Sequence, residues 1–478
     1  MVSNKKILLI DPKSVRHGPP KSIAESDNFI NKEYVRRINE EVDKRCPSNN
    51  GGAMSSKYVS NYGLLMLGSL LKQDYENVTY INGDYFGSSE EYLKYLASII
   101  SEYDLVSLTS TTPQFNEVRK IAMLLKQIKP DIKIILGGPH SRFYIEREVD
   151  DCFDTVAIGH GIDKSKESVD KLLRGEEVPK KTITNYYFDV PKDFSLIPKD
   201  LLKDTMLYSY INFGCPNDCK YCVEHKFVDK ICFNNLDDKF SEIKELATKH
   251  GVTFIHLADS DFLMHRKTVV EYIKFVKREK LNFTFSVNTS PAILIKYIND
   301  PILKELVDIG MVEILIGAEH FSKKVLDNLA KYYDIEKFIE ALNYAKHVVN
   351  IPIISLYTLV GLPGEYDEDI RINIDTIKRL KENNLFDFTF PKFFVPYPDS
   401  DIYLHPDKYD VTIKNENWEE YQRWQLPRPI AINGMDDQKY VDEILEINSI
   451  SMEEKKNEND CIASLCKKRK QNPNGSGE

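Results

Sequence analysis

The sequence has no long apolar run and few cysteines. No apolar stretch approaches the roughly 18–20 residues that a membrane-spanning helix requires, and residues 7–10, which follow two lysines, are too short for the core of a signal peptide. We therefore expect no membrane partner and no export. Eight cysteines in 478 residues are too sparse for a disulfide scaffold, which indicates the reducing cytoplasm.

An excess of positive charge is also missing. The chain has 64 lysines and arginines against 74 aspartates and glutamates, for a formal net charge of −10. This balance argues against a nucleic-acid partner. Hydrophobic residues make up 42% of the chain, which is typical of a globular protein, and the length predicts two to four domains.

Residues 1–185 alternate short apolar runs with stretches of helical periodicity, which predicts an α/β domain. The candidate strands are residues 6–10, 78–82, 105–109, 132–136 and 155–158. Apolar strands that alternate with helices indicate a Rossmann-like, doubly wound parallel sheet covered on both faces. Such sheets bind ligands at the carboxyl ends of their strands. Residues 12–56 are too long for an ordinary loop, so we expect a lid-like insertion there.

A second alternating series follows a linker at residues 186–204. Its candidate strands are residues 207–212, 253–257, 282–288, 312–317, 352–358 and 386–392. Six βα units predict a partial (β/α)6 TIM barrel over residues 205–400, with its chemistry at the carboxyl ends of the strands.

The remainder of the chain is less regular. For residues 401–452 we expect a small, mostly helical region that caps the substrate pocket, with Trp418, Tyr421 and Trp424 on one helix face in the core. Residues 453–478 are charged and then rich in Asn, Pro, Gly and Ser, which predicts a disordered tail.

The strongest chemical signal is a CxxxCxxC cluster formed by Cys215, Cys219 and Cys222, just after the first strand of the second series. An iron–sulfur cube normally takes four thiolates, so three would leave one iron open to another ligand. A closed Cys₃His zinc site with His225 is the competing interpretation. The position of the loop, at the start of a large barrel rather than in a small stapled module, favours the iron–sulfur cluster.

This triplet, with Tyr221 directly before its last cysteine, resembles the signature of the radical S-adenosylmethionine (SAM) superfamily. The resemblance implies that Cys215, Cys219 and Cys222 bind a [4Fe–4S] cluster whose open iron chelates SAM. It also implies an external one-electron reductant of the flavodoxin or ferredoxin type. Reductive cleavage of SAM then yields a 5′-deoxyadenosyl radical, while the protein supplies positioning, electrostatics and exclusion of water.

Further residues are similar to looser motifs of the superfamily. Ala258 and Asp259, at the end of the second strand, resemble the segment that meets the amino group of SAM, for which a carboxylate is a suitable acceptor. Asn288 and Glu319, which end the third and fourth strands, resemble polar positions that contact SAM.

Two later segments extend the resemblance. Gly361 opens a GLPGE turn after the fifth strand, where glycine lets backbone approach a ligand. Val395 follows the sixth strand, where the main chain of the superfamily usually holds adenine. Each match alone is weak, because polar strand ends are often helix caps, and their order along the barrel carries the joint interpretation.

The first 185 residues resemble the cobalamin-binding domain of B12-dependent radical SAM enzymes. The positions that match its nucleotide-tail loop, its GG turn and its last strand end are Thr109, Ser110, Thr111, Gly137, Gly138, Pro139 and Gly159. The DxHxxG motif that ligates cobalt in other B12 proteins is absent after Asp11, so the resemblance implies cobalt without this lower ligand. Arg16 or His17 is a candidate to face the metal, and the favoured alternative is that both are exposed loop residues.

The resemblance implies a B12-dependent radical SAM methyltransferase that alkylates an unactivated carbon, or a phosphinate phosphorus, of a small metabolite, natural-product precursor or peptide. One SAM would methylate cobalamin and a second would supply the radical. Two alternatives stay open: a radical rearrangement or cyclisation without net methyl transfer, and a zinc-stapled corrinoid- or ligand-binding protein. A tRNA-methylthiolating enzyme would carry three N-terminal cysteines, where only Cys46 and Cys152 occur. The substrate is not encoded in any motif.

Overall fold

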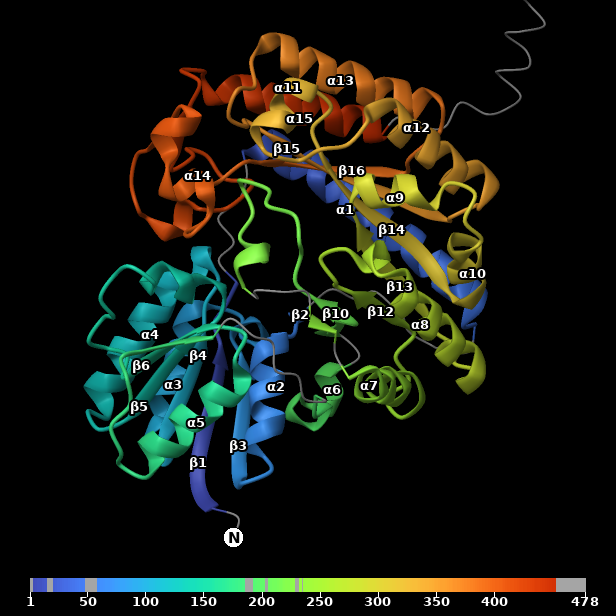
Figure 1. The fold of residues 1–478 in the computed structure, drawn as a ribbon. Helices are drawn as coiled ribbons and strands as arrows, with labels where there is room; N and C mark the ends of the chain where they lie inside the picture. Colours follow the sequence, from blue (N-terminus) through green and yellow to red (C-terminus); the bar gives the residue numbers. More distant parts are fainter. Residues whose placement is uncertain are drawn as a thin grey trace, which may run out of the picture.

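The computed structural model describes residues 3–14, 20–47, 58–184, 192–202, 205–227, 232–233 and 235–452. It consists of two α/β halves, with the N-terminal half in blue and teal at the lower left of Figure 1 and the second half at the right. The expectations for Arg16, His17 and the 453–478 tail lie outside the described residues.

The first half is built on a six-stranded parallel sheet in the order β3-β1-β4-β5-β6-β7. Its strands are β1 (Ser3–Asp11), β3 (Tyr75–Asn82), β4 (Leu105–Thr109), β5 (Lys133–Gly137), β6 (Thr155–Gly159) and β7 (Lys181–Thr184). The central strands are almost wholly buried because helices cover both faces. The predicted doubly wound parallel sheet is confirmed, with β7 as an additional edge strand.

Two pairs of helices cover the two faces of this sheet. The helices are α2 (Tyr62–Leu71), α3 (Ser89–Ile99), α4 (Phe115–Ile128) and α5 (Ile162–Leu173). Side chains of α2 and α5 share one core cluster with Leu9 of β1, whereas α3 and α4 share another with Leu8. This alternation follows from the two-residue period of a strand.

The second half is a six-stranded parallel sheet in the order β16-β15-β14-β13-β12-β9. Its strands are β9 (Tyr208–Ser209), β12 (Phe254–Leu257), β13 (Thr284–Thr289), β14 (Met311–Glu319), β15 (Ile353–Val360) and β16 (Phe388–Phe393). The helices that follow them include α7 (Leu236–Thr248), α8 (Arg266–Glu279), α10 (Ile302–Ile309), α12 (Ile335–Asn343) and α13 (Asp367–Glu382). Within the described strands, β9 and β16 each pair on one side alone, so the sheet stays open.

The segment expected to be a lid-like insertion contains the longest helix, α1 (Lys21–Arg45), and that expectation is wrong for this part. Buried side chains of α1 contact Phe254, Val312, Ile353 and Phe388, which begin their strands. The later part of α1 therefore covers the amino-terminal end of the second sheet, opposite to the end at which ligands are expected, while Asp27 near its start pairs with Lys392 close to the carboxyl end of β16. Buried apolar residues one or two helical turns apart on one face of α1, namely Ile23, Ile30, Ile38 and Val42, explain the docking.

Part of the predicted linker is packed in the core. Residues 192–202 form a 3₁₀ turn (Phe194–Leu196) and helix α6 (Lys199–Leu202). Phe194 is buried in the same cluster as Leu9 of the first half and Leu207 of the second. One continuous apolar core therefore joins the two halves, which fixes the distance between their strand ends.

The C-terminal region is less helical than expected. It contains α14 (Asp401–Leu404), a hairpin of β17 (Val411–Ile413) and β18 (Ile430–Ile432), and one long helix, α15 (Asp437–Met452). The expected aromatic helix face is wrong: Trp418 and Tyr421 are buried against the first half, whereas Trp424 is 36% exposed. None of the helices in the described ranges is both long and apolar enough to cross a bilayer.

Candidate functional site

Two cavities open at the carboxyl ends of the two sheets. The first-sheet cavity, of about 350 Å³, lies between β4, β5, β6 and α2 and is lined by Asn61, Tyr62, Met66, Leu67, Leu108, Thr109, Ile135, Gly137, Gly138, Pro139, Ala157, Gly159 and Ser165. The second-sheet cavity, of about 520 Å³, is lined by Cys215, Cys219, Tyr221, Cys222, Ser260, Asp261, Asn288, Glu319, Lys331, Tyr357, Lys392 and Arg423.

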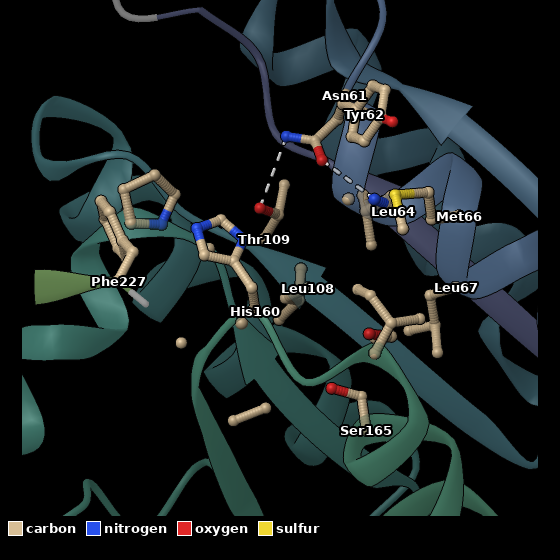
Figure 2. A pocket seen from close by; sticks show the side chains of 18 of the residues that line it. Asn61, Tyr62, Leu64, Met66, Leu67, Leu108, Thr109, His160, Ser165 and Phe227 are labelled. Carbon is tan, nitrogen blue, oxygen red and sulfur yellow. Dashed lines mark hydrogen bonds between the residues drawn. The ribbon is translucent and has the colours of Figure 1, made fainter. Parts of the chain in front are cut away.

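The two cavities share a wall. The residues that line both are Pro139, His160, Tyr210, Phe213, Phe227 and Ala258. The His160 ring packs edge-on against Phe213, with ring centroids 4.1 Å apart, and against Phe227, at 4.9 Å. A ligand that fills the first-sheet cavity therefore reaches the second across a thin aromatic boundary, part of which is seen in Figure 2.

The three clustered cysteines lie together on the wall of the second-sheet cavity, and all are half-buried. Their loop follows β10 (Asn212–Phe213) and is held by main-chain hydrogen bonds, including Lys220 N–H to Leu329 O at 2.9 Å. The Glu224 N–H donates to Cys222 Sγ at 3.4 Å. Burial raises the pKa of the Cys222 thiol to about 12 and that of Cys215 to about 11, so a bound cation is needed to hold them as thiolates.

The geometry disfavours the zinc interpretation. In a tetrahedral site with Zn–S bonds of about 2.3 Å, ligand atoms lie about 3.8 Å apart. No three of Cys215, Cys219, Cys222 and His225 bring donor atoms within 4.8 Å of one another in the described part of the chain. His225 instead directs Nε2 toward Asp218 Oδ1, at 3.2 Å. The four residues therefore do not form a closed tetrahedral site.

Another group with a metal-like donor set is His320, Glu365 and Glu443, all fully buried behind the sheet. The Ser322 N–H donates to His320 Nδ1 at 2.9 Å, so the ring proton of a neutral imidazole sits on Nε2. That nitrogen lies 3.1 Å from Glu365 Oε1 and therefore donates to it. Both ring nitrogens of His320 are engaged in hydrogen bonds, so neither has a lone pair free for a metal. The three residues therefore form a buried hydrogen-bonded cluster rather than a metal site.

The strand-end residues expected to meet SAM divide into two sets. Tyr221, Ala258, Asn288 and Glu319 line the second-sheet cavity. The Tyr221 hydroxyl donates to Glu319 Oε1 at 2.9 Å, and Glu319 adopts φ +64°, a conformation uncommon for residues other than glycine. Strain at this strand end is consistent with a functional position.

The structure does not bring Asp259, Gly361 and Val395 to this cavity. Asp259 is fully buried and accepts from the Ile211 and Asn212 N–H groups at 2.8 and 2.7 Å. Gly361 packs against a buried arginine, and Val395 belongs to the core beneath Trp418. These three residues instead contact neighbouring segments of the chain.

The sequence analysis missed the charged residues Glu224, Asp261, Lys331, Lys392 and Arg423, which line the cavity, and two of them lie close to predicted positions. Asp261 lies two positions beyond the expected acid and accepts from Thr289 Oγ1 at 2.8 Å and from Ser290 Oγ at 2.6 Å. Lys331 donates to Glu319 Oε1 at 3.0 Å and lies beside the cysteine loop. No motif marks either residue, because a loop twelve residues after Glu319 carries Lys331 back to it.

The residues expected to contact cobalamin also divide. Thr109, Gly137, Gly138, Pro139 and Gly159 line the first-sheet cavity. Ser110 and Thr111 do not: the Ser110 N–H donates to Gly137 O at 3.1 Å, and Thr111 is exposed and donates to Gln114. These two residues shape the loop rather than face the cavity. Figure 2 shows Asn61 joining Thr109 to the N-terminus of α2, through bonds of 3.5 and 3.0 Å.

The glycines of the GG turn have different physical roles. A Cβ built on Gly137 would meet no heavy atom closer than Leu108 O, at 3.9 Å, so it would project into the first-sheet cavity. Gly138 has φ +87°, and a Cβ there would lie 2.5 Å from Thr109 Oγ1. Gly137 keeps space for a ligand, whereas Gly138 allows the turn itself.

Comparisons with known proteins agree with this division. Residues 52–167 match the B12 binding domain family model, and residues 209–380 match the model of the Radical SAM superfamily. The combination defines a radical SAM enzyme with a B12-binding domain. The chain belongs to the cobalamin-dependent radical SAM enzyme family, whose cofactors are a [4Fe–4S] cluster, SAM and cobalamin.

Three curated relatives resemble most of the chain. An uncharacterized methyltransferase of Pyrococcus horikoshii is 22% identical over 75% of this chain and 81% of its own. The anaerobic magnesium-protoporphyrin IX monomethyl ester cyclase of Rubrivivax gelatinosus is 22% identical over 83% of this chain and 74% of its own. The bacteriochlorophyllide d C-8(2)-methyltransferase of Chlorobaculum tepidum is 25% identical, over 68% and 73%.

A solved structure shares the arrangement of the two halves. The radical SAM methyltransferase TsrM of Kitasatospora setae, with cobalamin and a [4Fe–4S] cluster bound, superposes with a TM-score of 0.63 at 14% identity, over 93% of this chain and 91% of that chain. At this identity the similarity concerns the fold.

The residues present fit the cofactors of the family. Three thiols on one cavity wall suit an iron–sulfur cluster with one open iron. The first-sheet cavity is mostly apolar and its floor at Gly137 lacks a side chain, which suits the flat nucleotide base of a corrinoid.

Proposed function

We propose that the protein transfers a methyl group from cobalamin to an unactivated carbon, or to a phosphinate phosphorus, of a small molecule or peptide. The shared wall of the two cavities carries this proposal, because methyl donor and substrate radical must meet. Two of the three relatives are named methyltransferases, which supports the same activity.

In this proposal the thiolates of Cys215, Cys219 and Cys222 hold the cluster. When bound, the cluster and SAM supply a 5′-deoxyadenosyl radical, and cobalamin carries the methyl group. The chain positions SAM with residues around the same cavity: Tyr221, Ala258, Asp261, Asn288, Glu319 and Lys331. The Glu319 carboxylate and Lys331 ammonium, 3.0 Å apart, match the opposite charges of an amino-acid group.

The first-sheet cavity receives the nucleotide tail of cobalamin in the same proposal. It is lined by Thr109, Gly137, Gly138, Pro139 and Gly159. His160, on the wall shared by the two cavities, would then lie between the bound cofactor and the second sheet. Asp11, at the place of the missing motif, is buried and accepts from Tyr80 OH at 3.0 Å, so it holds β1 to β3 rather than a ligand.

The domains and partners follow from these roles. We assign cobalamin binding to residues 1–185, radical chemistry to residues 205–400 and capping of the pocket to residues 401–452, whose Arg423 lines the second-sheet cavity. An external reductant of the flavodoxin or ferredoxin type supplies the electron. A cytoplasmic setting suits thiols that must stay reduced.

Anaerobic reconstitution tests the cluster assignment. We expect about four irons and four sulfides per chain with broad brown absorbance, and loss of both in Cys215→Ala. The matched control is Cys152→Ala, another half-buried cysteine, which lies outside the loop and should keep the cluster. A zinc-containing, iron-free protein would contradict the proposal.

Net methyl transfer is tested with SAM deuterated in its methyl group. A substrate-derived product that carries the label supports methylation. The alternative is a radical cyclisation without net transfer, which the resemblance to the Rubrivivax gelatinosus cyclase favours. A product of unchanged carbon count together with 5′-deoxyadenosine would establish that alternative.

A further inference from the structure

The second-sheet cavity contains three cations, and two of them are neutralised by acids of the protein. Lys331 donates to Glu319 at 3.0 Å, and Lys392 lies 3.1 Å from Asp27 Oδ2 of α1. Arg423 is different: among the described residues no carboxylate oxygen lies within 4.0 Å of its guanidinium. The Glu319 carboxylate acts on Arg423 from farther away, but it already forms an ion pair with Lys331, so this part of the cavity keeps an excess of positive charge that an anionic ligand can balance.

The Arg423 side chain faces free volume although it is surrounded by protein. Arg423 is exposed to solvent and lines the cavity. The guanidinium carbon lies 5.3 Å from the ring centroid of Tyr397, and the Phe393 N–H donates to Arg423 O at 2.7 Å. These contacts, with a hydrogen bond between the Arg423 and Tyr397 side chains, anchor the residue beside the segment after β16 while it still lines the cavity.

Tyr357 supplies a neutral donor on the same side. It is 40% exposed, in the middle of a strand whose other residues are buried, because it points into the cavity. Its hydroxyl makes no hydrogen bond within the part of the chain that the structure describes. Burial, then the Glu313 carboxylate, raises the pKa of Tyr357, and the positive charge of Arg423 opposes that rise, so Tyr357 and Arg423 interact electrostatically.

We propose that Arg423 and Tyr357 form an anion-binding end of the second-sheet cavity, and that the substrate carries a carboxylate or phosphinate group held there. An arginine fork matches a two-oxygen anion, and a phenol adds a third donor. This inference rests on the proposed function, because it names the chemistry of the substrate.

The carboxylate of SAM is the other source of such a group. Near the thiols, however, the Glu319–Lys331 pair already offers one charge of each sign to the amino-acid end of SAM. Tyr357 and Lys392 belong to β15 and β16, toward the edge of the sheet opposite to β9, after which the cysteine loop lies. Arg423, held beside Phe393 at the end of β16, is therefore assigned to the substrate side of the cavity, while Glu319 and Cys222 also contribute to its electrostatic environment.

Protection from phenylglyoxal tests the site on the reconstituted, full-length protein. Anaerobic modification of Arg423, followed by peptide mass spectrometry, should slow about fivefold in acetate or methylphosphinate, because these anions compete for the guanidinium. Acetamide at the same concentration and ionic strength should have no effect. Arg119, whose side chain is 46% exposed elsewhere, should react equally in all samples.

Further comparisons identify whether the substrate or SAM supplies the anion. Tyr357→Phe should weaken protection by acetate about threefold, as expected for one lost hydrogen bond. SAM and decarboxylated SAM should protect Arg423 equally; protection by SAM alone would overturn the assignment to the substrate. Equal reactivity with and without acetate and methylphosphinate would overturn the anion site itself. Because labelling requires no turnover, these outcomes are independent of whether the enzyme transfers methyl groups.

Discussion

Substitution at the GG turn separates ligand binding from folding. In Gly137→Val the new side chain has no protein atom within 3.9 Å of its Cβ and extends into the first-sheet cavity. The residue ends strand β5 at negative φ, where valine is favoured over glycine. We expect an unchanged or slightly raised melting temperature without ligand, together with loss of cobalamin binding.

The neighbouring position should behave in the opposite way. Gly138 has φ +87° and ψ 174°, a region open essentially to glycine, which costs about 1–3 kcal/mol for another residue. A Cβ at 2.5 Å from Thr109 Oγ1 and 2.6 Å from Ser110 N adds about 1–3 kcal/mol of overpacking. Gly138→Ala should therefore lose about 2–6 kcal/mol of the unfolding free energy.

A third glycine is the matched control for backbone strain. Gly175 also has positive φ, +75°, but a Cβ there would meet no atom within 4 Å. Gly175→Ala should lose the strain contribution alone, about 1 kcal/mol, and bind cobalamin normally.

Two measurements decide between these outcomes. Thermal unfolding without ligand gives stability, and titration with hydroxocobalamin, followed by visible absorbance, gives affinity. At a hundredfold excess over Kd, cobalamin should stabilise the wild type by about 2.7 kcal/mol and leave Gly137→Val unchanged. Normal cobalamin affinity in Gly137→Val would refute the assignment of the first-sheet cavity, and an unchanged melting temperature in Gly138→Ala would refute the argument from crowding.

Two further predictions concern the base of the second sheet. Arg37 Nη1 of α1 lies 2.8 Å from Asp387, which is fully buried, so Arg37→Ala should cost about 1–3 kcal/mol in urea unfolding. Arg36→Ala, which breaks two exposed ion pairs, should cost under about 1 kcal/mol, and equal losses in the two variants would contradict the docking of α1. Burial raises the pKa of Glu313 from 4.5 to about 7, so the folded state binds its proton more tightly than the unfolded state. The contribution of Glu313 to the unfolding free energy should be complete below pH 4.5 and should fall by up to about 3 kcal/mol as the pH rises through 7. Glu313→Gln should flatten that part of the pH–stability curve, and an unaltered slope would disprove the link.

Local pattern was sufficient for much of the architecture. The central strands are continuous apolar runs, and the periodicity of α4 places Val118, Ile121 and Leu125 on its buried face. The cysteine spacing and the GG turn lie within a few residues, so the groups that act together are also close in the sequence. These features require no knowledge of distant contacts.

The errors arose where distant segments meet. Helix α1 has the periodicity of a packed helix, yet no local pattern reveals that its partners begin strands more than 200 residues later. Asp261 faces the cavity, whereas Asp259, two residues earlier, bonds to the backbone of Ile211. Which of the two acids reaches the cavity depends on where the chain turns after β12.

The sequence by itself determined that two parallel sheets follow one another along the chain, that three cysteines share one loop, and that a glycine turn borders the first-sheet cavity. Tertiary structure alone decided which charges meet: Lys331 with Glu319, and Arg423 with open space beside Tyr357. The physical reason is that side-chain direction at a strand end depends on the twist of the sheet and on where the following chain returns. Both are set by packing between residues that are far apart in the sequence.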